Sequence, residues 1–327
     1  MTKLYIHLPS EKRKTMKKIF TSIFLFVLAI GLFGQKGKNE LTVLPYDSTT
    51  NFLGRNVQQY IGQELYLKGL EKSSQVYGYP GFILKYQKDN DLLNDEKNIY
   101  KPNGKNYTSR YEDLAGKYFQ VLDVVRHPKA KKDTDGYGDE FYFKLQEKSG
   151  GDIIYYKYNV NSEYTFPFIL TGFFIKEKQR LIGKEYVISD DVLSMSRNLV
   201  SGKALTFTTG QTWKCIDFDV DRNNNELSLI LQNSGGLRTS IPYSLIASTE
   251  GVKKVYTASE ALTMRKKYND NNYRRILQNK VRIGMTKEMT RLAWGEPTEI
   301  KQSGRNEVWS YPAGNLIFSG DKIISTK

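Results

Sequence analysis

The sequence predicts a mainly β protein with a C-terminal α+β domain. We expect repeated small antiparallel β meanders or Src-homology-3-like barrels to precede that domain. Strand-forming and aromatic residues alternate with polar ones over residues 40–250, between turns rich in Gly, Asn and Asp. Two stretches of this region repeat the same order of strands and turns. After Gly251 the apolar spacing becomes that of helices, which indicates a different domain.

Residues 1–34 are predicted to be a signal peptide with an upstream extension. Two lysines precede an apolar run over residues 19–33, and Gly34 ends it as a small residue before the cleavage point. This apolar run is short for a membrane span, and no second run of its kind follows. We therefore expect an exported, soluble mature chain with no transmembrane span.

The rest of the chain is long enough to divide into several small cores. Changes of composition place an irregular β-rich region at residues 35–111 and a first β module at residues 112–180. A second β module is expected at residues 181–250, and the α+β domain at residues 251–327.

The repeat lies in the two β modules, over Phe119–Tyr158 and Trp213–Tyr243. Each stretch has a strand, a polar loop, a second strand, a Ser-Gly-Gly turn and a third strand that ends in tyrosine. A Gly-Lys pair, at Gly116 and at Gly202, precedes each stretch and is expected to start its first strand. A lone meander would expose an apolar face and two edges, so we expect closure into a barrel or a curled sheet.

Few side chains are available for nucleophilic chemistry. After the predicted signal peptide the chain has one cysteine, Cys215, and one histidine, His127. These counts exclude an intramolecular disulfide and the usual zinc sites. His127 precedes a proline and a lysine-rich run, which indicates a solvated hairpin loop, whereas Cys215 alternates with Trp213 and is expected to be buried. We predict no catalytic residue and no cofactor.

Polar hairpin loops in both modules resemble parts of calcium-binding loops. Neither loop completes the calcium pattern, and Asp and Asn are also common in hairpins because they tolerate left-handed turns. We therefore predict no metal site. The residues considered are Asp133, Asp135, Gly136, Asp139 and Glu140 in the first loop, and Asp219, Asp221, Asn223 and Asn225 in the second.

The C-terminal segment predicts helices followed by strands. Thr257 and Glu260 form a capping box for a helix that runs to about Tyr268, where an Asn-Asp-Asn-Asn run should interrupt it before a second helix. A third helix is expected to begin at Thr286 and to end at Gly295. Three short strand segments are then expected at residues 298–302, 307–311 and 315–325, the last with a turn at Gly320-Asp321.

Residues 274–325 contain, in this order, the motifs Gly284-Met285-Thr286, Gly295-Glu296-Pro297 and Trp309-Ser310-Tyr311. In these motifs the segment resembles the SmpA/OmlA, or BamE-like, domain. The resemblance implies two helices against a three-stranded antiparallel sheet, in envelope proteins that act by binding other proteins and not by catalysis. The founding members are lipoproteins with a cysteine at the mature N-terminus, whereas Gln35 occupies that place here. We expect the motif residues to form turns and core.

The positive charge of the chain is concentrated in the helical segment. The whole chain has a net charge of +14, and residues 253–291 hold eleven Lys and Arg against three Asp and Glu. Because export is predicted, we expect an anionic envelope surface or an envelope protein as the partner, and no nucleic acid. The alternative is a solvated face that binds nothing, and charge runs on helices ordinarily favour that alternative. The predicted binding residues are Arg265, Lys266, Lys267, Arg274 and Arg275.

Together these features predict a secreted or periplasmic, non-enzymatic envelope protein, peripheral to the outer membrane, that acts through protein or envelope-surface binding. One alternative is a carboxylate-dependent glycan-active enzyme, because two Asp or Glu residues suffice for that chemistry. Another is a structural protein associated with the cell wall. A cleft with two facing acids and aromatic walls would favour the enzyme, and flat exposed sheets would favour the binding protein.

Overall fold

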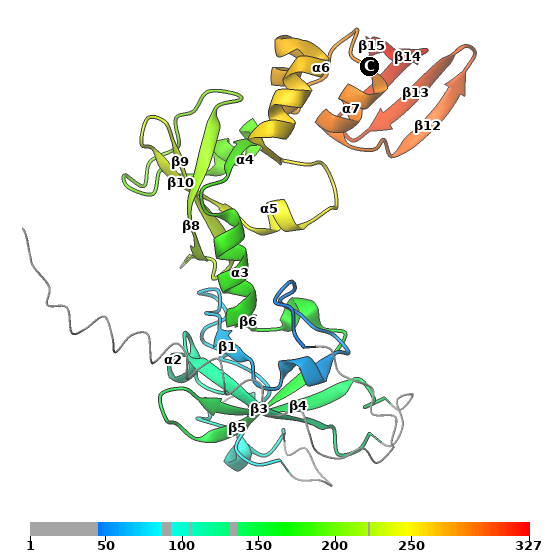
Figure 1. The fold of residues 1–327 in the computed structure, drawn as a ribbon. Coiled ribbons are helices and arrows are strands. Elements are labelled where there is room, and N and C mark those ends of the chain that lie inside the picture. Colours follow the sequence, from blue (N-terminus) through cyan, green and yellow to red (C-terminus); the bar gives the residue numbers. More distant parts are fainter. Residues whose placement is uncertain (1–44, 87–92, 105, 131–135, 222) are drawn as a thin grey trace, which may run out of the picture. The chain divides into compact units, whose positions relative to one another are not determined.

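The computed structural model describes residues 45–327 except 87–92, 105, 131–135 and 222, so the predicted signal peptide lies outside the described residues (Figure 1). The described chain is a mixed α/β structure with three antiparallel sheets. Within these residues no helix combines the length and the apolar character needed to cross a membrane.

The first sheet has six strands in the order β2-β5-β4-β3-β1-β6. Its strand β1 comes from residues 35–111 and pairs with β3, so the sheet takes strands from both sides of residue 111. The strands are β1 (Glu64–Leu67), β2 (Phe82–Ile83), β3 (Tyr118–Arg126), β4 (Glu140–Glu147), β5 (Ile153–Asn159) and β6 (Phe168–Leu170). One short helical turn, η1 (Val57–Tyr60), precedes β1, and others lie between the strands at η2 (Glu96–Asn98), α2 (Tyr111–Leu114) and η3 (Glu163–Thr165).

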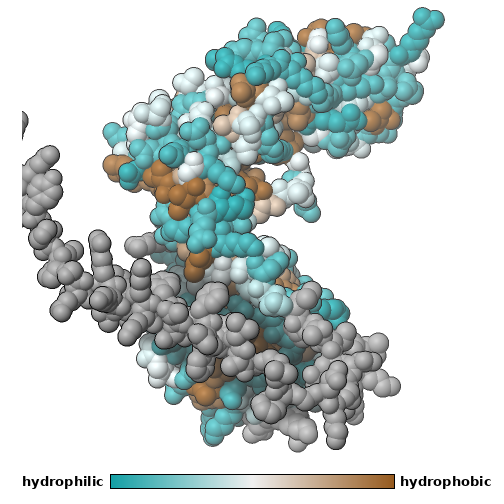
Figure 2. Space-filling model, viewed as in Figure 1, coloured by the Kyte–Doolittle hydropathy of each residue, from teal (hydrophilic) through white to brown (hydrophobic). Residues whose placement is uncertain are grey.

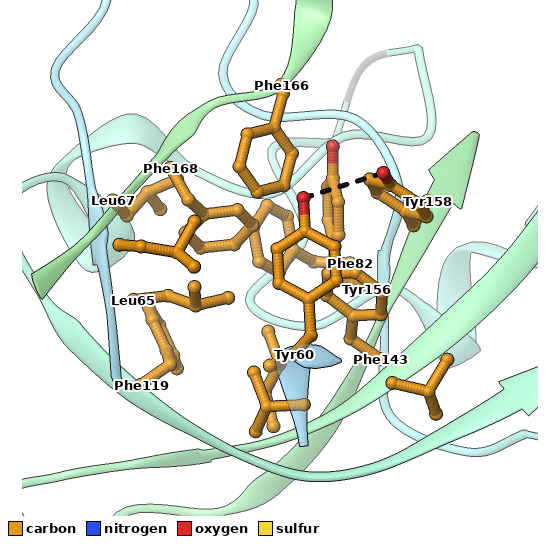
Figure 3. Close-up of a cluster of buried hydrophobic side chains, with 14 of the residues drawn as sticks. Tyr60, Leu65, Leu67, Phe82, Phe119, Phe143, Tyr156, Tyr158, Phe166 and Phe168 are labelled. Carbon is orange, nitrogen blue, oxygen red and sulfur yellow. Dashed lines mark hydrogen bonds between the residues drawn. The ribbon is translucent and has the colours of Figure 1, made fainter. Parts of the chain in front are cut away.

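Aromatic rings fill the core on one face of this sheet (Figure 3). The rings of Tyr60 and Phe143 lie 4.6 Å apart between centroids. Buried hydroxyl groups need partners: the Tyr60 hydroxyl bonds the Tyr158 hydroxyl at 3.5 Å, and the latter donates to the Gly54 carbonyl at 2.9 Å. Burial raises the pKa of Tyr60 to about 12. The alternation in the sequence thus produces a buried aromatic core.

The second sheet has five strands in the order β10-β9-β8-β7-β11. Helix α3 leads into it from the first sheet, and α4 and α5 lie in its connections. The strands are β7 (Glu185–Ile188), β8 (Thr212–Val220), β9 (Leu227–Asn233), β10 (Arg238–Pro242) and β11 (Val255–Thr257). The helices are α3 (Thr171–Leu181), α4 (Asp190–Met195) and α5 (Ser244–Ala247).

Both sheets are open, so the prediction of small closed barrels was wrong. In the first sheet, a side chain and not a further strand bonds the outer edge of β6. The Asn51 side chain donates to the Phe168 carbonyl at 2.9 Å and accepts from the Leu170 amide at 2.8 Å, which satisfies the outer edge of β6. In both sheets the chain leaves the last strand directly into a helix and does not return to close a barrel.

The predicted meanders are confirmed as β3-β4-β5 and β8-β9-β10 (Figure 1). They share a detail that strand propensity alone does not specify. The register between their first two strands shifts at Leu122 in one copy and at Ile216 in the other. The carboxylate that follows each shift, from Asp123 or Asp217, accepts from the next backbone amide at 2.8 Å. Each copy therefore has a bulge at the same place.

The duplication extends beyond the meander that the sequence repeat predicts. Leu65 of β1 lies opposite Phe119, and Tyr186 of β7 lies opposite Trp213. Outside these strands, β6 pairs with β1 just as β11 pairs with β7. Each edge strand runs directly into a helix, α3 after β6 and α6 (Ala258–Leu277) after β11. The repeated unit is therefore five strands and a helix.

The two predicted Gly-Lys pairs are not equivalent positions. Gly116 has a φ of +77° and lies two residues before the start of β3. The same place before β8 is occupied by Gly210, with a φ of +80°. Gly202 instead lies in a turn, where its amide donates to the Asn198 carbonyl at 2.8 Å. The left-handed glycine is thus the repeated feature, and the lysine is not.

The predicted helix boundaries in the C-terminal segment are confirmed. Thr257 and Glu260 make both hydrogen bonds of the capping box at the start of α6. Asn269, with a φ of +61°, kinks this helix where the Asn-rich run was expected to interrupt it. Helix α7 (Lys287–Trp294) begins after its cap Thr286, and Gly295 ends it at a φ of +82°.

The third sheet has four strands in the order β12-β13-β14-β15, because the turn predicted at Gly320-Asp321 divides the last of the three expected segments into two strands. Gly320 has a φ of +58° in this turn. Residues from α6 and α7 pack with this sheet in one core (Figure 1). The strands are β12 (Glu299–Ser303), β13 (Asn306–Tyr311), β14 (Gly314–Ser319) and β15 (Lys322–Thr326).

Candidate functional site

The side chain of Cys215 is buried in the core of the second sheet, as predicted. Its thiol donates to the Asp217 carbonyl at 3.3 Å. Burial raises the pKa of this thiol to about 11. Because the thiolate is the reactive form of cysteine, burial makes this thiol a poor nucleophile at neutral pH.

His127 is buried, so the prediction of a solvated loop position was wrong. Its ring stacks on Tyr137 at 4.4 Å between centroids, with an angle of 7° between the planes. Its Nδ1 accepts from the Lys129 amide at 3.2 Å, and its Nε2 lies 3.6 Å from Glu140 Oε2. The stacking and the carboxylate on β4 draw the ring inward. The imidazole therefore joins the end of β3 to its neighbours.

The second polar hairpin loop uses its side chains for turns and packing. The Asp221 carboxylate accepts from the Asn223 amide at 2.8 Å, and Asn225 has a φ of +58°. The Asn225 side chain donates to the Leu70 carbonyl at 3.0 Å, beside Gly69, where a Cβ would lie 2.2 Å from Asn225 Oδ1. These bonds fix the hairpin against the loop that follows β1.

Part of the first loop, including Asp133 and Asp135, lies outside the described residues. Of the remaining calcium candidates there, Asp139 pairs with Arg55 at 2.6 Å and Glu140 pairs with Lys157 at 2.9 Å. Within the part of the chain that the structure describes, no group of three or more His, Cys, Asp and Glu side chains is arranged to hold a metal ion.

The predicted basic residues lie on both sides of the kink in α6, and acidic partners neutralise most of them. Asp270 bonds Arg265 at 2.7 Å with one carboxylate oxygen and Arg274 at 2.9 Å with the other. Lys267 reaches α7, where its Nζ lies 2.6 Å from Glu288 Oε1. These three side chains therefore stabilise the kink and the helix pair, and they do not form an open basic face.

Lys266 and Arg275 are the two predicted binding residues that remain available. Among the described residues neither forms an ion pair; Lys266 is exposed and Arg275 is half-buried. Figure 2 shows one face of the molecule. The described residues on this face are mostly hydrophilic, and the hydrophobic ones lie in small groups. A surface of this kind suits contacts with charged partners better than a large apolar interface.

The motif residues of the C-terminal segment form turns and core, as predicted. The Trp309 side chain is buried, donates to Glu307 Oε2 at 3.0 Å and packs on Phe318 at 4.6 Å between ring centroids. The Arg291 guanidinium lies 4.5 Å from the Trp309 ring centroid. The Tyr311 hydroxyl donates to the Gly295 carbonyl at 3.1 Å and so connects β13 to the end of α7.

A cavity of about 720 Å³, which we call the tyrosine cleft, was not predicted from the sequence. It contains Tyr66 and Tyr118, whose ring centroids are 5.1 Å apart. The Glu64 carboxylate in its wall accepts from the Thr171 hydroxyl at 3.1 Å and pairs with Lys148. The residues that line it are Glu64, Tyr66, Tyr111, Tyr118, Lys148, Ile169, Thr171, Phe174, Ile175, Asp219, Val220 and Asn225.

One signal for the tyrosine cleft is present in the sequence. In β1, Glu64 and Tyr66 alternate with the core residues Leu65 and Leu67, so they belong to the opposite face of the sheet. The sequence does not show that α3 crosses that face without filling it, because this depends on contacts between distant segments.

Comparison with protein-family models, with curated proteins and with solved structures gives no match to this chain. The features of this chain that bear on its function are therefore its own: the buried thiol and imidazole, the largely neutralised basic residues of α6, and the tyrosine cleft.

Proposed function

We propose that this chain is an exported, non-enzymatic protein of the cell envelope that acts by binding. The observation that carries the proposal is the construction of the C-terminal segment, which we propose to be a BamE-like domain. Its helices pack with an antiparallel sheet, the motif residues Trp309 and Tyr311 lie in its core, and charged side chains cover its helices. The fourth strand is an addition to the three that the resemblance implies.

The layout of residues 1–34 supports export, and we propose a place peripheral to the outer membrane for the mature protein. In this compartment an anionic envelope surface is available to basic side chains. Lys266 and Arg275 are the residues that we propose to contact it.

The state of the side chains supports binding over catalysis. The thiol of Cys215 and the imidazole of His127 are both packed in the interior. A glycan-active enzyme needs one carboxyl group that donates a proton. In the tyrosine cleft, the Glu64 carboxylate is instead engaged by Lys148 and by the Thr171 hydroxyl.

Vesicle binding by charge-reversed variants tests this proposal. Sedimentation with vesicles that contain phosphatidylglycerol should capture the mature protein, and the bound fraction should fall as salt rises, because exposed charges are screened over about 10 Å at 0.1 M ionic strength. The double change Lys266→Glu and Arg275→Glu should weaken this binding several-fold. A matched control, Lys184→Glu with Lys214→Glu, changes the net charge equally at exposed positions near the second sheet.

The control variant should bind as the unchanged protein does, apart from a small effect of net charge. Circular dichroism verifies that both variants fold. If the protein does not bind phosphatidylglycerol vesicles, or if both double variants lose binding equally, Lys266 and Arg275 are not a binding site.

A further inference from the structure

The duplicated units differ in how a helix covers the outer face of each sheet. In the second unit Val187 and Tyr256 pack with Ala261, Tyr273 and Leu277 of α6 in a buried apolar cluster. The equivalent face of the first unit, under α3, contains the tyrosine cleft. One copy of the same architecture is thus packed at this face, and the other is hollow.

The strand registers identify the positions that differ. Tyr66 lies between Tyr118 and Ile169 in a row across β3, β1 and β6. In the second unit the corresponding row is Thr212, Val187 and Tyr256 across β8, β7 and β11. The first unit has tyrosines at two positions where the second has a threonine and a valine. These two rings line the cleft.

Further rings of the tyrosine cleft are supported from behind. Tyr111 stacks on Tyr79 at 5.9 Å between centroids with an angle of 16° between the planes. Phe174 of α3 stacks on Phe218 at 5.5 Å. Tyr118 is 44% exposed. The cleft therefore offers several aromatic surfaces, held in place by packing, one of which is open to solvent.

The polar groups of the cleft suit an uncharged ligand with many hydroxyl groups. Glu64 and Lys148 neutralise each other, Thr171 adds a hydroxyl, and the exposed carboxylate of Asp219 adds an acceptor and one negative charge. These side chains provide hydrogen-bond acceptors and donors, and the small negative excess disfavours an anionic ligand. A volume of about 720 Å³ is within the range of small-molecule binding sites.

Recognition of a peptide by strand addition is not available here. Strands β1 and β3 each have neighbours on both sides. The outer edge of β6 is already bonded by the Asn51 side chain. A ligand of the tyrosine cleft must therefore be recognised by ring surfaces and side-chain polar groups, not by backbone pairing.

We infer that the tyrosine cleft binds a neutral oligosaccharide. The C–H faces of a sugar ring pack on aromatic rings, while its hydroxyl groups donate to carboxylates and accept from ammonium groups. Tyr66 and Tyr118 provide the stacking surface, and Glu64 and Lys148 provide the polar contacts. This site is separate from the basic residues of α6 and adds a second ligand class to the proposed function.

Calorimetric titration of the mature protein with three probes tests the inference: the trisaccharides of glucose with α-1,4 links, of glucose with β-1,4 links, and of N-acetylglucosamine. At least one should bind. Tyr118→Ala should weaken that binding about tenfold or more, and Tyr118→Phe should retain most of it, because the ring provides the contact. Tyr164→Ala is the matched control, since Tyr164 is 91% exposed and lies outside the cleft.

Failure of all three probes to bind at millimolar concentration would contradict the inference. So would binding that Tyr118→Ala leaves unchanged in a folded variant. Tyr66→Ala provides a second test at the neighbouring ring. The variant with Lys266→Glu and Arg275→Glu should bind the sugar normally, so failure of the vesicle experiment and failure of this one are distinguishable.

Discussion

Burial controls the chemistry of the single cysteine in the described chain. Cys215 lies in β8, and burial raises the pKa of its thiol to about 11. We expect an aromatic disulfide reagent at pH 8 to label the native protein far more slowly than the protein unfolded in guanidinium, where the thiol regains a pKa of about 8.5. Equal labelling rates in the two states would contradict this burial.

The carboxylate of Glu177 in α3 provides a test of pH dependence. Burial raises its pKa, but hydrogen bonds from Arg180 and Tyr243 lower it more, so the net pKa lies below the ordinary value. A depressed pKa contributes stability above the unfolded pKa of about 4.3, and this contribution is lost as the pH falls through the folded pKa.

We therefore expect Glu177→Gln to lower the melting temperature at pH 7 and to have a smaller effect at pH 3. Glu185→Gln, at an exposed carboxylate of β7, is the matched control and should have little effect at either pH. An equal loss from Glu177→Gln at both values of pH would show that the charge of Glu177 does not stabilise the fold.

At the scale of the elements, the C-terminal sheet depends on one ring. Trp309 is buried between Arg291 and Phe318, and Trp309→Ala should lower the free energy of unfolding by roughly 3–5 kcal/mol. Its cross-strand neighbour Ile300 on β12 is 48% exposed, so Ile300→Ala should have less than half that effect. Urea unfolding followed by far-ultraviolet circular dichroism measures both, and similar losses would contradict a core centred on Trp309.

Elements whose ends depend on local chemistry were predictable from the sequence. The capping pair Thr257 and Glu260 and the terminal Gly295 each act within a few residues of the chain, so their patterns were sufficient. Barrel closure was not predictable, because it depends on contacts such as that of Asn51 with β6, which are distant in sequence. The burial of His127 was not predictable either, because it results from contacts with Tyr137 and Glu140 that the sequence pattern does not specify.

At the scale of the whole described chain, one arrangement of strands and a following helix occurs twice. The meanders were visible in the sequence because their turns and strand ends share residue types. The matching outer strands were not visible, because short strands such as β6 and β11 share a position and not a sequence. The tyrosine cleft was not predictable for a similar reason. It depends on how α3 covers its sheet, which differs from the way α6 covers the second sheet.

Export is the central claim of the proposed function, because it determines which partners the protein meets. Expression of the full chain in a Gram-negative host, followed by fractionation and intact-mass measurement, tests it most directly. We predict recovery from the periplasmic or envelope fraction with a mass that lacks residues 1–34. Recovery only from the cytosol with residues 19–33 still present would contradict the claim.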